Sequence, residues 1–391
     1  MKEWKTYRIG DICKTNSSQY STKEAWDEFL YLDTGNITRN IIEDIVRYAS
    51  AAELPSRARR KVVNDDIIFS TVRPNQCHFG ILSNPPANLL VSTGFTVITA
   101  NKKIVDPYYL YYYLTQDSIV DYLHSIGEQA VSAYPSIKAQ DIEDIEIELP
   151  DLSTQNNIAK TLRALDNKIQ LNRQINDNLE QQAQAAFNNI LAKYSECETI
   201  NLSEIATLNP KRTITKGTLA RSIEMAQLPT SGSFPAGWDM KEYNGGMKFQ
   251  NGDTLMARIT PCLENGKVAY INFLEENEVA FGSTEYIVIA SKGAIAPEVF
   301  YFLTRHNDFV DFATKNMNGS SGRQRVSSET IGTYKLPVIS PEDMVMLETI
   351  AKEALNKIKY NSLENIRLSE MRDTLLPKLM SGELKINEID G

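Results

Sequence analysis

The chain of 391 residues repeats itself once along its length. Three blocks of the first half recur in the second half, in the same order and at a nearly constant offset: residues 8–12 with 201–205, 64–69 with 251–256, and 92–98 with 283–289. In both halves a proline then opens an aromatic run, at Pro107 and at Pro297. A duplication of this length restricts the fold to two similar units in tandem.

Each repeat combines strand-like and helical patterns. Residues 67–69 and 95–98 are short β-branched and aromatic runs between polar turns, which predicts strands. The tyrosine-rich stretch 108–123 has apolar residues at helical spacing. This spacing predicts a packed helix with its tyrosines in the core, in preference to tyrosines that stack on bases. The predicted fold class is therefore α+β.

Each half ends in a long segment with a heptad pattern. Apolar residues recur every three or four positions over residues 158–190, and again over residues 347–379. A seam of this length must be buried, and the simplest partner for one copy is the other, packed antiparallel as a coiled coil. The alternative is two separate helices, each packed on its own domain.

Asparagine interrupts the heptad seam at the same two positions in both copies. These positions are Asn172 and Asn176 in the first copy, and Asn361 and Asn365 in the second. A polar seam residue weakens packing but fixes the register, because its amide needs a partner across the interface. The sequence therefore predicts that Asn172 and Asn176 lie near the Asn361/Asn365 end of the partner helix, or are buried in the same seam.

The ends of the two helices are marked by local signals. The first helix is expected to open around Ser153, and Ser340 followed by Pro341 predicts the start of the second. Pro377 should kink or end the second helix, and Gly382 is its expected C-terminal cap. The domain order is then a globular domain, a helix, a globular domain and a helix with a tail, over residues 1–152, 153–194, 195–339 and 340–391.

Composition limits the chemistry open to the chain. Its four cysteines, Cys13, Cys77, Cys197 and Cys262, lie far apart and lack metal-ligand spacing, which predicts reduced thiols in a cytoplasmic protein. No apolar run suits a membrane helix or a signal peptide. Residues 84–87 read Asn-Pro-Pro-Ala and lack the aromatic that the similar tetrapeptide of amino-methyltransferases uses, and there is no glycine-rich cofactor loop. We expect no catalysis, no cofactor and no metal.

The net charge of −9 taken alone argues against a nucleic-acid binder. The charge is uneven, however: residues 57–61 hold four cations and no acid, and residues 323–325 read Arg-Gln-Arg. Residues 70–76, after a predicted strand, supply Arg, Asn and Gln, the side chains that read base edges. Residues 258–267 are their counterpart, and residues 130–138 and 319–325 form a second pair of loops with hydroxyls and cations that suit phosphate.

These loops give the candidate DNA-binding residues. In the first half they are Arg57, Arg59, Arg60, Lys61, Ser70, Thr71, Arg73, Asn75, Gln76, Tyr134, Ser136 and Lys138. In the second half they are Arg258, Thr260, Asn265, Lys267, Ser320, Ser321, Arg323, Gln324 and Arg325. The cluster at 57–61 is expected on phosphate, whereas Arg73, Asn75 or Gln76 are expected to reach bases.

At these motifs the chain resembles the specificity subunits of type I restriction-modification enzymes. The resemblance rests on Ser-x-x-Arg-Pro at 70–74, Ser-Thr-Gly-Phe-x-Val at 92–97, residues 149–159 and residues 375–384, and it covers nearly the whole chain. The second half departs from the pattern, with Arg-Ile-Thr-Pro at 258–261 and Glu285-Tyr286 in place of Gly-Phe.

The resemblance implies a function and a set of partners. Each globular domain would be a target-recognition domain that reads one half of a split sequence in double-stranded DNA. The two helices would form a spacer that docks two methyltransferase subunits, which translocating restriction subunits join. Three alternatives stay open: a stand-alone DNA methyltransferase, a scaffold that does not bind DNA, and the recognition subunit of a related defence or type II system.

Overall fold

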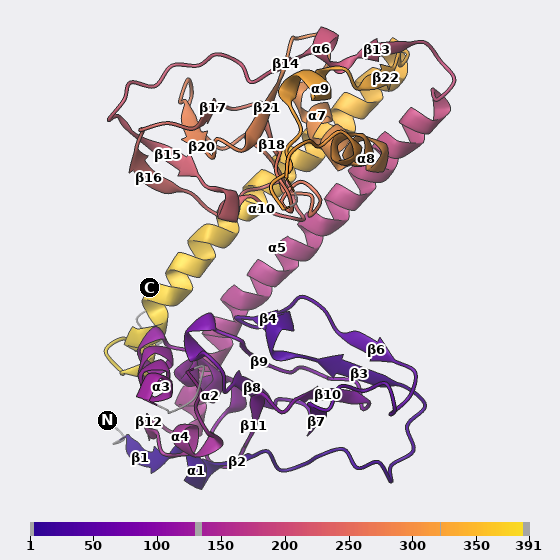
Figure 1. The fold of residues 1–391 in the computed structure, drawn as a ribbon. Helices are drawn as coiled ribbons and strands as arrows, with labels where there is room; N and C mark the ends of the chain where they lie inside the picture. Colours follow the sequence, from indigo (N-terminus) through magenta and orange to yellow (C-terminus); the bar gives the residue numbers. More distant parts are fainter. Residues whose placement is uncertain (1–3, 130–134, 321, 386–391) are drawn as a thin grey trace. The chain divides into compact units, whose positions relative to one another are not determined.

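The chain divides into two compact units in the computed structural model, which describes residues 4–129, 135–320 and 322–385 (Figure 1). Unit 1 consists of residues 1–167 and 369–391, and unit 2 consists of residues 168–368. Two long helices, α5 (Leu152–Lys193) and α10 (Pro341–Met380), each contribute residues to both units.

Unit 1 contains two four-stranded sheets, ordered β6-β3-β10-β7 and β2-β11-β8-β9, and two smaller pairs, β1-β12 and β4-β5. Its strands are β1 Lys5–Arg8, β2 Cys13–Thr15, β3 Phe29–Leu32, β4 Ile37–Thr38, β5 Ile41–Ile42, β6 Val46–Tyr48, β7 Ala58–Lys61, β8 Ile67–Ser70, β9 Phe79–Ile81, β10 Leu89–Ser92, β11 Phe95–Ala100 and β12 Glu146–Leu149. Its shorter helices are α1 Ile9–Ile12, η1 Thr34–Asn36, η2 Pro74–Gln76, α2 Pro107–Leu114, α3 Asp117–Gln129 and α4 Ala139–Glu143.

Unit 2 contains four-stranded sheets ordered β16-β15-β20-β17 and β14-β21-β18-β19, and the pair β13-β22. Its strands are β13 Thr199–Asn201, β14 Ala206–Leu208, β15 Leu219–Ile223, β16 Asp239–Glu242, β17 Met247–Phe249, β18 Thr254–Ala257, β19 Val268–Tyr270, β20 Ala280–Gly282, β21 Tyr286–Ser291 and β22 Lys335–Pro337. Its shorter helices are α6 Leu202–Ile205, η3 Met225–Gln227, α7 Pro297–Arg305, α8 Asn307–Lys315 and α9 Ser328–Gly332.

The four-stranded sheets of the two units match strand for strand. The order β2-β11-β8-β9 corresponds to β14-β21-β18-β19, and in each unit the other large sheet holds one parallel pair, β10 with β3 and β20 with β15. The register agrees as well, because Phe95 lies opposite Ser70 just as Tyr286 lies opposite Ala257. The duplication expected from the sequence is thus confirmed at the level of topology.

The tyrosine-rich stretch of unit 1 belongs to the core. Tyr109, Tyr111 and Tyr112 are all buried, which confirms the expected packing. The stretch forms two helices instead of the single one expected. Thr115 leaves helical geometry after α2, and Asp117 starts α3 with an acidic residue in its first turn.

The two long helices begin at side-chain caps. Ser340 Oγ accepts a hydrogen bond from Asp343 N at 3.3 Å directly before Pro341, as expected. The first helix starts one residue earlier than expected, because Asp151 Oδ1 takes the Thr154 N–H at 2.9 Å. At the other end α10 continues through Pro377 to Met380, and Gly382 follows with a φ of 72°.

Within unit 2, α5 and α10 lie antiparallel and their seam asparagines meet. Asn172 Nδ2 donates to Asn365 Oδ1 at 2.9 Å, and Asn361 Nδ2 donates to Asn176 Oδ1 at 2.8 Å. Asn172 and Asn361 are almost fully buried. The expected proximity of the two asparagine pairs is confirmed, so in unit 2 the helices are not packed separately.

Unit 1 joins the other ends of the same two helices to its globular part. Arg372 Nη1 of α10 donates to Asp166 Oδ1 of α5 at 2.8 Å, and Tyr112 Oη of α2 donates to Asp166 Oδ2 at 2.6 Å. Ile158 of α5 and Leu379 of α10 are buried in the same apolar core as the tyrosines of α2. Asp166 thus links three helices of unit 1.

Within residues 4–129, 135–320 and 322–385 there are no membrane-spanning helices, metal-ligand clusters or disulfides. No helix in these ranges has an apolar stretch sufficient to span a bilayer. They also contain no cluster of three or more His, Cys, Asp or Glu side chains suited to a metal ion. The four cysteines, which lie in these ranges, are unpaired thiols.

Candidate nucleic-acid interface

In unit 1, the two candidate loops that sequence analysis selected lie against each other. Ile137 N donates to Thr71 O at 2.8 Å, and Arg73 N donates to Pro135 O at 2.9 Å. These bonds place the loop after β8 beside the segment that leads into α4. The structure therefore brings together two stretches that are more than sixty residues apart in the sequence.

Two hydroxyl groups of the first loop stabilise the loop itself. Ser70 is 2% exposed, and its Oγ donates to Val72 O at 3.0 Å. Thr71 Oγ1 donates to Gly94 O at 2.8 Å. Ser70 was expected to face DNA, but its burial at the end of a central strand leaves no surface for a ligand.

The tip of the loop is a short η2 helix that follows Arg73. Arg73 has a φ of 47°, which lies in the left-handed region that residues other than glycine rarely adopt. Asn75 and Gln76 are exposed. Because the residues around them are held by backbone hydrogen bonds, these two amides are presented on an ordered turn.

A hairpin that sequence analysis did not select lies beside this tip. Arg39 and Asn40, between β4 and β5, both have positive φ, and Arg39 N donates to Cys77 O at 2.8 Å. Arg39 is exposed, with one ion pair to Asp117 at 3.4 Å. The sequence Arg-Asn lacks the Asn-Gly or Asp-Gly signal of such turns, so this cation was missed.

In unit 1, the cluster at 57–61 lies at the edge strand β7 and is only partly available. Lys61 is bonded to Glu24, and burial lowers the pKa of Arg60. Arg59 Nε donates to Ser56 O at 3.3 Å, and Arg57 is exposed. The four cations thus have different surroundings, which the sequence of residues 57–61 did not indicate.

The last candidates of unit 1 are in the second loop. Lys138 is exposed and precedes α4, where its N–H donates to Asp141 Oδ2 at 2.6 Å. Ser136 is half-buried, opposite Val72. Tyr134 lies outside the described residues.

In unit 2, the counterpart loops are joined in the same way. Val326 N donates to Arg258 O at 3.0 Å, and Thr260 N donates to Gln324 O at 3.1 Å. Thr260 Oγ1 also accepts the Gln324 N–H at 2.9 Å. The pairing of a post-strand loop with a pre-helix segment is therefore a shared feature of both units.

A hairpin carries the basic residues of unit 2. Asn318 and Arg325 exchange backbone hydrogen bonds of 2.9 Å, and between them Ser320 and Arg323 are exposed. Ser321 lies outside the described residues. The hairpin thus presents Arg323 at the surface.

Sequence analysis missed the carboxylate at the centre of this region. Glu285 binds Arg325 through hydrogen bonds of 2.8–3.0 Å and lies 3.5 Å from Arg258 Nε. The hydrogen bonds from Arg325 lower the pKa of Glu285 and keep it ionised. Glu285 was noted only as a departure from Gly-Phe, and a partner forty residues away has no sequence signal.

The remaining candidates of unit 2 differ in exposure. Asn265 is exposed. Lys267 Nζ donates to Met225 O at 2.7 Å, so part of its hydrogen-bonding capacity is used within the unit. Of these two side chains, Asn265 is therefore the better placed to meet a ligand.

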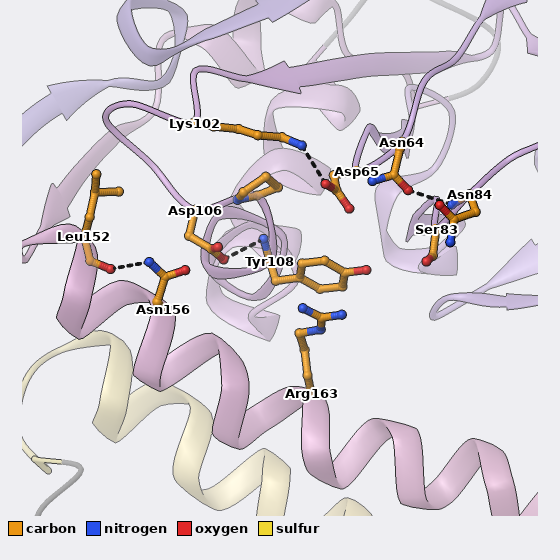
Figure 2. A pocket seen from close by; sticks show the side chains of 11 residues that line it. Asn64, Asp65, Ser83, Asn84, Lys102, Asp106, Tyr108, Leu152, Asn156 and Arg163 are labelled. Atoms are coloured by element: carbon orange, nitrogen blue, oxygen red, sulfur yellow. Dashed lines mark hydrogen bonds and ion pairs between the residues drawn. The ribbon is translucent and has the colours of Figure 1, made fainter.

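Unit 1 also has a polar pocket of about 440 Å³ (Figure 2). Lys102 Nζ is 2.6 Å from Asp65 Oδ2, and the Arg163 guanidinium lies 3.6 Å from the centre of the Tyr108 ring. Its lining contains none of the candidate DNA-binding residues. Asp65 precedes β8 whereas loop 70–76 follows it, so the pocket and the candidate loops flank opposite ends of one strand.

Residues 1–181 match the family model described as type I restriction modification DNA specificity domain. Along 98% of its length the chain also aligns with the type I restriction enzyme HindI specificity subunit of Haemophilus influenzae, of which it covers 100% at 23% identity. The chain is therefore similar to type I restriction enzyme specificity subunits along nearly its whole length, and its first 181 residues match their DNA specificity domain.

Further type I specificity subunits are similar to the chain over comparable lengths. The MjaIX specificity subunit of Methanocaldococcus jannaschii is 21% identical and aligns with 99% of this chain and 95% of its own. The crystal structure of a type I S subunit from M. genitalium matches with a TM-score of 0.57 over 96% of each chain, at 16% identity. This structural match supports the same fold.

Proposed function

We propose that the chain is the DNA-recognition subunit of a type I restriction-modification complex, and that each unit reads one half of a bipartite target. The observation that carries the proposal is the repeated loop pair, built on equivalent backbone hydrogen bonds with different side chains in the two units. A conserved backbone with different side chains suits two domains that recognise different DNA sequences. Side chains read the base edges, and the backbone positions those side chains.

The division of labour follows the elements of the chain. Residues 1–152 and 195–339 are the proposed target-recognition domains, and residues 153–194 and 340–391 supply the spacer. The hydrogen bonds of Asn172 with Asn365 and of Asn176 with Asn361 support an antiparallel coiled coil. Its outer surface would dock two methyltransferase subunits, which restriction subunits join.

The subunit itself is proposed to be non-catalytic. Base methylation would come from the partner subunits, because residues 84–87 lack the aromatic that stacks on a flipped base. Methylation of DNA by the purified chain alone would contradict this assignment.

Methylome sequencing of a host that carries the chain with its partner subunits tests the recognition function. We expect methylation at an asymmetric site with two short defined blocks around a gap of unspecified bases. The two blocks should differ, because the side chains at the two loop pairs differ. A continuous target, or the same methylome with and without this chain, would contradict the proposal.

The spacer sets the gap if the helices act as a ruler. Deletion of one heptad from each helix removes roughly 10 Å of helix, which corresponds to about three base pairs. The shortened protein should recognise the same blocks with a smaller gap, or lose recognition. An unchanged gap in an active shortened variant would contradict the ruler.

A further inference from the structure

Three neighbouring positions of the loop pair differ together between the two units. In unit 1 they carry Thr71, Gly94 and Ser136, which have no charge. Thr71 N donates to Gly94 O at 2.8 Å, and Ser136 lies in a β-bridge opposite Val72. This backbone arrangement brings the three positions together without any ion pair among them.

Unit 2 has the same backbone arrangement with charged side chains. Arg258 N donates to Glu285 O at 3.0 Å, and Arg325 lies in a β-bridge opposite Ile259. The equivalent positions therefore hold Arg258, Glu285 and Arg325. Two cations and their shared carboxylate occupy a site where unit 1 has three small uncharged residues.

Glu285 holds one edge of the Arg325 guanidinium. Nε donates to Oε1 at 3.0 Å and to Oε2 at 2.9 Å, and Nη2 donates to Oε1 at 2.8 Å. Nη1 donates to Arg323 O at 3.0 Å, at the base of the exposed hairpin. The guanidinium is thus fixed at both ends while 36% of the side chain is exposed.

The contacts leave a defined part of Arg325 for a ligand. An arginine has five N–H groups, and the bonds above use the Nε–H, one N–H of Nη2 and one of Nη1. Among the residues that the structure describes, these contacts leave one N–H on each Nη atom. Two N–H groups on adjacent nitrogens match the O6 and N7 acceptors of guanine in the major groove.

Charge favours a base over a phosphate as the partner of this group. The two guanidiniums and one carboxylate leave one net positive charge, so the attraction for phosphate is weaker than two unpaired arginines would give. A side chain fixed before binding also loses less conformational entropy when it reads a base.

We propose that Glu285 is a positioning residue, which orients Arg325 to read a guanine in the half of the target that unit 2 recognises. The inference rests on the proposed DNA-reading function. From its sequence context, Arg325 was expected to contact phosphate. Its hydrogen bonds with Glu285 favour base recognition instead.

Selection from duplex DNA with randomised positions tests this role. The full-length chain is incubated with the library at two salt concentrations, and bound DNA is sequenced. The wild type should enrich a two-block motif with a guanine in the unit 2 block. Arg325→Lys and Glu285→Gln should reduce the preference for that guanine by roughly 5- to 150-fold, with the unit 1 block unchanged.

Two further variants separate positioning from folding. Glu278→Gln removes another carboxylate–arginine pair of unit 2, with Arg221 at 2.8 Å, and should leave all base preferences unchanged. The triple variant Arg258→Thr, Glu285→Gly, Arg325→Ser installs the residues of unit 1 on the equivalent backbone. Thermal unfolding should show that this variant is folded. The variant should lose the preference for the same guanine.

The possible results are distinguishable. An equal loss of affinity for every sequence in Glu285→Gln would indicate a merely structural role and overturn the inference. So would a wild-type motif whose guanine preferences survive in both Arg325→Lys and the triple variant. If the wild type enriches no motif, the proposed function fails and the inference falls with it.

Discussion

Unit 1 and unit 2 place an aspartate at the same point of the same strand, but they satisfy it differently. Asp66 precedes β8 and Asp253 precedes β18, and each is almost fully buried. Each accepts a backbone N–H from three residues earlier, at 2.8 Å in both units. The turn that starts the strand therefore has the same side-chain cap in both copies.

The other oxygen contacts of these aspartates have diverged. Asp66 accepts the Thr99 hydroxyl at 2.7 Å, whereas Asp253 accepts Nη2 of Arg212 at 2.5 and 2.7 Å. A neutral donor in one unit is a guanidinium in the other. The comparison teaches that the backbone plan was retained after duplication while side-chain partners changed, at the strand start as well as at the loop pair.

Replacement of one unit is the largest test of this comparison. If residues 1–150 are exchanged for the equivalent domain of a related specificity subunit, one block of the target should change completely and the other should stay. The physical reason is that each unit holds its own loop pair. Methylome mapping of the hybrid with its partners measures this, and a change in both blocks would disprove independent units.

The aspartates should differ in how much stability they contribute. Asp253→Asn leaves the Arg212 guanidinium, which is 13% exposed, without its counter-ion, so unit 2 should lose about 3–5 kcal/mol. Asp66→Asn disturbs bonds with neutral donors and should cost unit 1 about 1 kcal/mol. Hydrogen exchange of β18 and β8 reports each unit, with the other unit as its control. Equal losses in the two variants would remove the distinction.

Cations at different places in unit 1 should affect DNA binding in different ways. Arg73→Ala should cost about 1–3 kcal/mol on the cognate sequence alone, because its loop is ordered around the tip. Arg57→Gln should weaken binding to all sequences and reduce the salt slope by about one. Binding to cognate and random duplexes over a salt series measures both. If the two variants behaved alike, the assignment of Arg73 to bases would fail.

The smallest expected effect is a pH dependence of unit 1. Burial raises the pKa of Asp66 above its value in the unfolded chain. Between the unfolded and folded values the folded state binds more protons, so stability falls as pH rises through this window. Asp66→Asn should remove that decline. Hydrogen exchange of β8 against pH in both proteins checks the sign, and parallel curves would contradict it.

The features that sequence predicted well are periodic or repeated. The heptad pattern located the two long helices, the local signals at Ser153 and Ser340 placed their starts to within about a residue, and the seam amides lie together as their positions indicated. The repeated blocks gave the correspondence between β8 and β18. These signals survive in one dimension because spacing along the chain determines which side of an element a residue occupies.

The sequence could not show how distant parts of the chain bury or pair the candidate side chains. Ser70 belongs to a hydroxyl-rich loop by sequence, but the end of a central strand buries it. Lys61 is bonded to Glu24 and Arg325 to Glu285, and the sequence separation of each pair gives no signal of the contact. The availability of a long cationic side chain depends on these neighbours, so composition alone could not rank the candidates.

The paired amides of α5 and α10 make the register of the helices a discrete quantity. A slip by one heptad in one direction would place Asn172 opposite Ile358 and Asn361 opposite Ile169, and each unpaired buried amide costs about 1–3 kcal/mol. During evolution, the paired helices could therefore change length only by whole heptads added to both helices. The gap between the two blocks of the target would then change in discrete steps, and selection would act on each complete helix length.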